Sequence, residues 1–189
     1  MAAIFDQGRD RQDCVKTILI ICVGNPSRGD DAIGPLIAEK LSSQTQAPLG
    51  FDVIETFQLQ PELVEDMHDR QLVLVVDAQA NTNETFTLRT VSPAPEFGWC
   101  SHAVSPEQLL TLFQTVYGHP TFTLMTLGIR AEQFELGSPL SNNVSVSINR
   151  ATEAILKFIS EMSRLSISSE DVLAVLQSQL TSEGHPLHA

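Results

Sequence analysis

The alternation of short apolar segments with amphipathic ones constrains the fold of this chain more than any other feature of its sequence. Thr17–Gly24 and Gln71–Ala78 are almost continuously apolar, as expected for strands that are covered on both faces of a parallel sheet. Between them, Ile33–Leu41 repeats apolar residues at helical spacing, Phe51–Phe57 alternates as a second strand, and Pro61–His68 indicates a short helix. The resulting βαβαβ order predicts a three-layer α/β/α domain.

The second half of the chain continues this alternation. Thr85–Val91 alternates apolar and polar residues, which is typical of an edge strand. Ser105 supplies an N-cap, followed by a proline and then a glutamine three residues after the cap, so a helix should begin there. Phe122–Ile129 indicates a core strand, Val144–Met162 a long amphipathic helix, and Ser168–Leu180 a last helix.

The loop after the first strand is a cluster of turn-forming residues, Asn25–Asp30, that leads into a helix. Asp30 or Asp31 is suited to cap this helix, and Pro35 is tolerated only in its first turn. The loop lies where the first parallel strand ends. It is therefore the first candidate for a functional segment.

Charge and composition exclude several classes of partner. The chain has 189 residues with 23 acidic and 11 basic side chains, a net charge of −12. Such a charge repels phosphate backbones and anionic lipids, so we expect neither nucleic acid nor a membrane as partner. The longest apolar run, Ile18–Val23, is too short to span a bilayer, and the N-terminus has no signal-peptide pattern, which predicts a cytoplasmic protein.

Length and cysteine content indicate one domain in a reducing compartment. We expect a domain over residues 1–165, followed by an extra helix and a flexible tail over residues 166–189. The three cysteines, Cys14, Cys22 and Cys100, are scattered and odd in number, which favours neither a disulfide framework nor a thiolate zinc site. Cys22 lies inside the first strand, where a small apolar side chain is the usual role.

Three segments place chemically useful side chains at the carboxyl ends of the predicted strands. The first contains Asp30 and Asp31, the second contains Asp77 as the only charge in its run, and the third contains His102 before the capped helix. Each has an ordinary alternative: a helix cap for Asp31, a loop anchor for Asp77 and a solvated loop position for His102. We expect two carboxylates and one imidazole to meet at one rim of the sheet.

The chemistry of such a group depends on whether a metal ion is bound. One imidazole nitrogen and two carboxylate oxygens form a three-ligand site for zinc or nickel, with positions left open for water or a substrate carbonyl. Without an ion, two neighbouring carboxylates raise one another's pKa, and one of them can act as a general base. Both states are compatible with hydrolysis at neutral pH.

Four motifs in order resemble one known family. The chain is similar to the hydrogenase maturation proteases, which process the large subunit of nickel-iron hydrogenases, and the resemblance extends over about Thr17 to Ile159. The motifs are Ile20–Gly34, Val75–Ala78, Ser101-His102, and Leu127–Arg130 followed by Gly137 and Leu140-Ser141.

The resemblance implies a fold and an activity. The fold is a phosphorylase/hydrolase-like three-layer sandwich with a twisted, mostly parallel, mixed five-stranded sheet. The activity is an aspartic-type endopeptidase that is monomeric when free and removes a short C-terminal extension from a nickel-iron hydrogenase large-subunit precursor. Nickel is supplied by that precursor after its insertion, although another divalent ion is possible.

The resemblance also implies roles for particular residues. Asp31, Asp77 and His102 correspond to the metal-binding and catalytic residues of the family, and Gly24 and Asn25 shape the loop that admits the substrate. Asp30 is assigned to substrate binding together with these two loop residues.

This chain departs from the family pattern at a few positions. Several relatives carry glutamate where this chain has Asp31, which leaves open whether Asp30 or Asp31 points inward. Pro35 replaces an aliphatic residue, and the segment beyond Arg164 has no counterpart. The alternative reading is a Rossmann-like small-molecule binding module without protease activity, but the loop after the first strand lacks the Gly-x-Gly-x-x-Gly pattern.

Overall fold

A five-stranded sheet forms the centre of the protein in a computed structural model that describes residues 18–44, 50–95, 103–164 and 169–181. The strand order is β2-β1-β3-β5-β4, and only the β4–β5 pair is antiparallel. The predicted mixed, mostly parallel sheet is therefore confirmed, with β4 at an edge. The strands are β1 (Ile18–Val23), β2 (Phe51–Thr56), β3 (Leu72–Gln79), β4 (Phe86–Thr90) and β5 (Thr123–Arg130).

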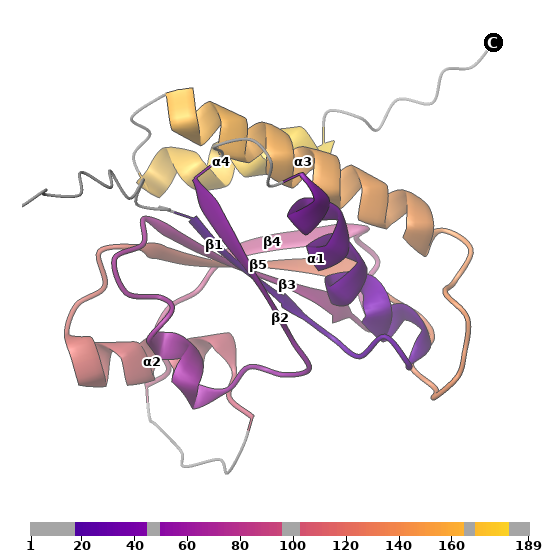
Figure 1. The fold of residues 1–189 in the computed structure, drawn as a ribbon, viewed down its shortest axis with the longest axis horizontal. Helices are drawn as coiled ribbons and strands as arrows, with labels where there is room; N and C mark the ends of the chain where they lie inside the picture. The colour runs from indigo at the N-terminus through magenta and orange to yellow at the C-terminus, as the bar shows by residue number, and fades with distance from the viewer. Residues whose placement is uncertain (1–17, 45–49, 96–102, 165–168, 182–189) are drawn as a thin grey trace, which may run out of the picture.

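Helices cover both faces of this sheet, which confirms the three-layer α/β/α architecture. Figure 1 shows α1, α3 and α4 on one side of the sheet and α2 on the other, where the short 3-10 helix η2 also packs. The helices among the described residues are η1 (Gly29–Ala32), α1 (Ile33–Ser43), η2 (Pro61–Val64), α2 (Pro106–Tyr117), α3 (Val144–Arg164) and α4 (Ser169–Thr181).

Strand β1 illustrates how the sheet is buried on both faces. Its even-numbered residues pack against α1 and α3, and its odd-numbered residues pack on the side of α2 and η2. Alternation along a strand sends successive side chains to opposite faces, so a strand covered on both sides must be apolar throughout. Cys22 is fully buried, and burial together with the Glu55 charge raises the pKa of its thiol to about 12. Its predicted role as a small apolar side chain is confirmed.

The predicted helix starts are right for α2 and wrong in one detail for α1. The Ser105 hydroxyl accepts a hydrogen bond from the Gln108 amide at 3.2 Å, and the Gln108 side chain accepts one from the Ser105 amide at 2.9 Å. This is the capping box that the sequence predicts. Helix α1 begins after η1 with Ala32 as its N-cap and without a side-chain cap, while Pro35 lies in its first turn. Asp30 does not cap α1 because its carboxylate binds a different loop.

The last helix belongs to the same core as the rest of the chain. Leu176 and Leu180 of α4 are buried in the cluster formed by α1, α3 and the sheet. The proposed boundary at residue 165 and the capping role of Ser168 lie outside the described residues, as do Cys14 and Cys100. Among the described residues, none of the helices has the length and apolar character needed to cross a membrane.

Candidate active site

A cavity of about 580 Å³ opens at the carboxyl ends of the parallel strands, on the face that carries α2. It extends from the end of β2 across β1, β3 and β5 to β4, so segments distant in sequence share its wall. This is the position where ligands bind in open α/β sheets. Its lining includes Arg28, Asp31, Phe57, Asp77, Arg89 and Gly128.

Asp77 lies in the wall of this cavity near the end of β3, the middle strand of the sheet. Two residues earlier, Val75 points to the same face and is buried, so the alternation of β3 directs Asp77 toward the cavity. The opposing residue of β5 is Gly128, where a Cβ atom would overlap the Gln79 side chain.

The environment of Asp77 makes ionisation of its carboxyl less favourable than in water. Its side chain retains access to solvent through the cavity, but the surrounding walls remove part of its hydration. Desolvation raises the pKa of this carboxyl to about 6; a hydrogen bond from the Ala78 amide opposes the shift, and the negative charge of Asp31 adds to it. The expected effect of a neighbouring carboxylate is therefore present at Asp77, with desolvation as the larger cause.

Asp31 lies in the same cavity, because the loop between β1 and α1 folds tightly over the end of β1. A Cβ atom at Gly24 would overlap the carbonyl oxygen of Asp31, and Gly24 has φ +148°, a value that favours glycine. A Cβ atom at Gly34 would overlap the carbonyl oxygen of Val23. These close approaches hold the start of α1 against the end of β1 and place Asp31 at the cavity.

Gly34→Ala tests this packing. Alanine favours a helix interior over glycine by up to about 1 kcal/mol, but the new methyl group would meet the backbone of Val23, which cannot rotate away. We therefore expect a net loss of about 1–3 kcal/mol, typical of overpacking, measured by urea denaturation. Glu39→Ala, an exposed position on α1, is the control and should change stability little. An equally stable Gly34→Ala variant would contradict the close approach.

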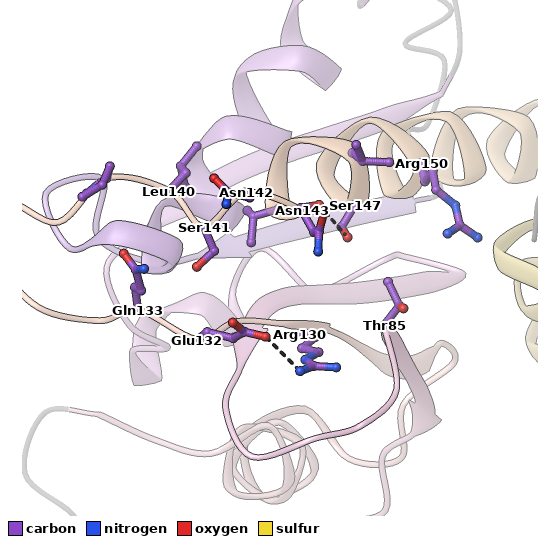
Figure 2. A pocket seen from close by; sticks show the side chains of 13 residues that line it. Thr85, Arg130, Glu132, Gln133, Leu140, Ser141, Asn142, Asn143, Ser147 and Arg150 are labelled. Carbon is purple, nitrogen blue, oxygen red and sulfur yellow. Dashed lines mark hydrogen bonds and ion pairs between the residues drawn. The ribbon is translucent and has the colours of Figure 1, made fainter.

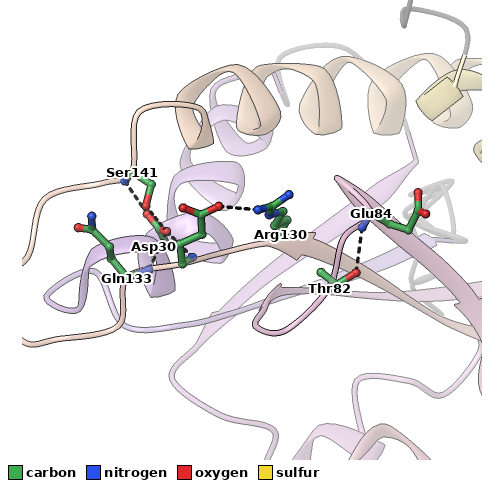
Figure 3. A network of polar contacts seen from close by, with 7 residues as sticks. Asp30, Thr82, Glu84, Arg130, Gln133 and Ser141 are labelled. Atoms are coloured by element: carbon green, nitrogen blue, oxygen red, sulfur yellow. Dashed lines mark hydrogen bonds and ion pairs between the residues drawn. The ribbon is translucent and has the colours of Figure 1, made fainter.

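Asp30 points away from the cavity and anchors a distant loop. Its side chain is 0 % exposed, and its carboxylate accepts four hydrogen bonds, which Figure 3 shows in part. The donors are the amides of Glu132 at 2.8 Å, Gln133 at 3.0 Å and Ser141 at 2.7 Å, and the Ser141 hydroxyl at 2.6 Å. Desolvation alone would raise the pKa of Asp30, but these hydrogen bonds outweigh it and lower the pKa.

This arrangement answers which of the two adjacent carboxylates faces the cavity: Asp31 does. Asp30, assigned to substrate binding from the sequence, instead joins the β1–α1 loop to the segment after β5. Neither Gly24 nor Asn25 is among the cavity-lining residues. The Asn25 side chain accepts a hydrogen bond from the Ser27 amide at 2.9 Å, which stabilises the turn. A contact of Gly24 or Asn25 with substrate stays a prediction.

Two arginines, Arg28 and Arg89, also line the cavity, and neither was predicted from the sequence as a site residue. The Nε of Arg28 donates to the Phe134 carbonyl at 3.1 Å, and Arg89 pairs with Glu107 at 2.9 Å. Arg28 lies inside the Ile20–Gly34 motif. For Arg89, the alternation of the predicted edge strand Thr85–Val91 is the only sequence signal. Both bring positive charge to a cavity that also contains two aspartates.

His102, the third predicted ligand, lies outside the described residues, so its convergence with the two aspartates stays a prediction. The residues that follow it in the sequence, Ala103 to Ser105, line the cavity, and the Val104 amide donates to the Leu59 carbonyl at 3.1 Å. Among the described residues, no group of three histidine, cysteine, aspartate or glutamate side chains could hold a metal ion.

A second cavity, of about 600 Å³, contains none of the metal ligands predicted from the sequence. Figure 2 shows Arg130 and Arg150 among its lining side chains, near the start of α3. Arg130 pairs with Glu132 at 2.8 Å, and Arg150 donates to the Leu180 carbonyl at 3.2 Å. This cavity therefore lies beside the loop that Asp30 anchors, and the cavity with Asp31 and Asp77 is the better candidate for catalysis.

Comparison with solved structures finds the same fold in several proteins. The hydrogenase maturating endopeptidase HybD from E. coli aligns with a TM-score of 0.60 and 25% identity, covering 77% of this chain and 93% of that chain. The [NiFe] hydrogenase maturation protease HycI from Thermococcus kodakarensis aligns with a TM-score of 0.56 and 24% identity, covering 77% and 93% respectively.

A third structure, the endopeptidase HycI from Escherichia coli, aligns with a TM-score of 0.57 and 21% identity, covering 75% of this chain and 90% of that chain. At the identities of the two HycI structures the likeness shows the fold alone. No family model matches the chain, and no curated protein matches it. The similarity to the hydrogenase maturation proteases that the sequence motifs indicate is confirmed by the fold.

Proposed function

We propose, from its hydrogenase maturation protease fold, that this chain is an endopeptidase that acts on the large-subunit precursor of a nickel-iron hydrogenase. It removes a short C-terminal extension after nickel has been inserted, and it recognises the nickel that the precursor carries. In this reaction the metal is part of the substrate. The enzyme works as a soluble cytoplasmic monomer.

The observation that carries this proposal is the meeting of Asp31 and Asp77 in one cavity at the carboxyl edge of the sheet. They come from η1 and β3, 46 positions apart in the sequence, and the charge of one affects the pKa of the other. Residues 103–105, directly after His102 in the sequence, line the same cavity. This supports, as the third ligand, an imidazole delivered by the segment before α2.

The donor set suits nickel held briefly. Two carboxylate oxygens and one imidazole nitrogen are acceptable ligands for nickel, but softer thiolates bind such ions more strongly. Asp31, Asp77 and His102 would therefore contact the nickel of the precursor without removing it from cysteine ligands. A precursor without nickel lacks this contact and binds less well, so cleavage follows metal insertion.

The cleavage itself requires a water molecule and a group that moves protons. In an aspartic-type reaction, one carboxylate accepts a proton from the attacking water as oxygen bonds to the scissile carbonyl carbon. The proton then passes to the amide nitrogen as the C–N bond breaks, leaving a carboxylic acid and an amine. Asp77 is suited to this role because β3 pairs with strands on both sides and holds it rigidly.

The loop after β1 argues against the alternative of a dinucleotide-binding module. Gly24 packs against the Asp31 carbonyl and Pro35, so this glycine serves a close approach within the chain. Two aspartates precede α1, where a bound phosphate would require positive charge or free amides. The Rossmann-like binding module therefore has less support than the protease.

Cleavage of nickel-loaded and nickel-free precursor by purified protein tests the proposed function. We expect the loaded precursor to be cut at least roughly tenfold faster, equivalent to about 1.4 kcal/mol of differential binding. His102→Ala should remove most of this activity, whereas His119→Ala, an exposed histidine after α2, should retain it. Mass spectrometry identifies the released extension. Equal cleavage of both precursors, or full activity of His102→Ala, would contradict nickel recognition.

A further inference from the structure

The outer edge of β2 presents unpaired backbone groups among the described residues. β2 is the terminal strand of the sheet and pairs there only with β1. The Gly50 carbonyl accepts from Ile18 and the Thr56 carbonyl accepts from Gly24, so even-numbered residues of this segment direct their amides and carbonyls toward β1. In a parallel strand the intervening residues direct theirs to the other side. Phe51, Val53 and Glu55 therefore offer backbone donors and acceptors outward.

This edge leads directly into the candidate active site. The residues that follow β2, Phe57, Gln58 and Leu59, line the cavity that contains Asp77. Phe57 is 71 % exposed, so the end of the edge and the entrance to the cavity form one continuous surface. A chain lying along the outer edge of β2 would therefore lead toward the cavity.

The opposite edge of the sheet is formed by β4. In β4 the residues Phe86 and Leu88 pack on the cluster that includes Leu176 and Leu180 of α4, and a smaller cavity of about 310 Å³ lies between the two elements. Helix α4 therefore packs against the face of β4, and the β4 edge serves as the comparison for the β2 edge.

We propose that the outer edge of β2 binds the C-terminal segment of the protein substrate as an added strand, next to the scissile bond. This inference rests on the proposed function, because it assumes an extended polypeptide as substrate. Strand addition supplies main-chain hydrogen bonds that are independent of side-chain identity. It also holds the segment extended, which exposes a single peptide bond to the catalytic carboxylates.

The sheet geometry fixes how far the scissile bond lies from this anchor. The order β2-β1-β3 separates Asp77 on β3 from β2 by two strand spacings, and the added strand lies one spacing further out. The distance is therefore about 14 Å at 4.8 Å for each spacing. An extended chain covers about 3.3 Å per residue. The paired segment should therefore end roughly four residues from the bond that is cleaved.

The binding test uses a synthetic peptide that copies the C-terminal segment, extension included, of the large-subunit precursor from the same organism. The amides of Val53 and Glu55 should exchange rapidly in free protein and be slowed at least roughly tenfold at saturating peptide, as read by NMR. Glu55→Pro removes one outward donor and should weaken peptide binding roughly two- to tenfold beyond Glu55→Ala, the range of one hydrogen bond.

A matched proline on the other edge controls for a general effect. In β4, Thr85 and Val91 bond to β5, so the amide of Thr90 points outward and Thr90 is exposed. Thr90→Pro should leave binding and cleavage at the level of the unmodified protein. Circular dichroism of each variant checks that it is folded, and the exchange measurement on unmodified protein needs no substitution.

The outcomes separate this inference from the proposed function. If the nickel-loaded precursor is cleaved but the two amides exchange at an unchanged rate, and Glu55→Pro behaves like Glu55→Ala, the β2 inference is overturned and the protease remains. If the amides become protected while no precursor is cleaved, strand addition is supported and the proposed activity fails. Protection that appears without peptide and grows with protein concentration would assign the edge to a second copy of the chain and overturn the inference.

Discussion

Asp77→Asn should lower kcat/KM for cleavage of nickel-loaded precursor by roughly 10²–10⁴-fold, the range for loss of a general acid or base. The substitution conserves shape but removes both the negative charge and the group that accepts a proton. Gel or mass-spectrometric assay of precursor processing measures the loss. Glu39→Gln, an exposed carboxylate on α1 outside the cavity, is the control and should process the precursor at the normal rate.

The same substitution should stabilise the metal-free protein in a pH-dependent way. The pKa of Asp77 is about 6 in the folded protein against an ordinary value of 3.8, so the folded state binds this proton more readily than the unfolded state. The ionised carboxylate therefore destabilises the fold fully above pH 6, and this cost disappears as the pH falls below 3.8. Melting in a chelator should give Asp77→Asn a higher Tm than the unmodified protein at pH 7.5.

This difference in Tm should shrink through the window between pH 6 and pH 4, since the unmodified protein then gains its proton. Reduced activity together with raised stability is typical of a residue placed for function, whereas a structural residue loses both. An inactive variant that is also less stable at pH 7.5 would contradict the catalytic interpretation. A fully active variant would remove Asp77 from the mechanism.

Asp30→Ala should cost about 3–5 kcal/mol of unfolding free energy, the range for removing one member of a buried charged group. The substitution leaves the amides of Glu132, Gln133 and Ser141 without the acceptor that they share, and buried donors without partners are costly. Urea denaturation at pH 7 measures this loss. Because the folded pKa of Asp30 is lowered, its contribution is complete above the ordinary value of 3.8 and disappears as the pH falls through the lowered pKa.

Asp31→Ala is the matched control for this experiment. The two aspartates are adjacent, but the Asp31 side chain faces the cavity and its removal relieves repulsion on Asp77. Its stability change should stay within about 0.5 kcal/mol, as for substitutions outside buried networks. Equal losses for both variants would contradict the assignment of Asp30 as the anchor. The reverse order would exchange the roles of the two residues.

The local sequence pattern was sufficient to predict a strand or a helix start where one physical requirement acts on neighbouring residues. A strand covered on both faces must be apolar throughout, so β1 and β3 were predictable from their composition. The capping box before α2 was predictable because its donors and acceptors lie within four residues. The shorter form of η2, which ends at Val64 and not His68, shows that such boundaries are less certain than the presence of an element.

The candidate site was predictable only in part. Strand topology brings the carboxyl ends of β1 and β3 to one rim, so Asp77 and the pair Asp30–Asp31 were expected together. Which of the two adjacent aspartates faces the cavity could not be predicted from their positions in the sequence. It depends on a loop more than a hundred residues later, whose amides bind Asp30 and so leave Asp31 for the cavity.

The amino-acid sequence by itself determined the order of strands and helices and the residue types available for catalysis, because periodicity and capping act over a few residues. Only the tertiary structure decided which carboxylate lies in the cavity, how desolvation shifts the pKa of Asp77, and which strands form the two edges of the sheet. Those properties arise from contacts between segments far apart in the chain, and their energies depend on burial that no local pattern records.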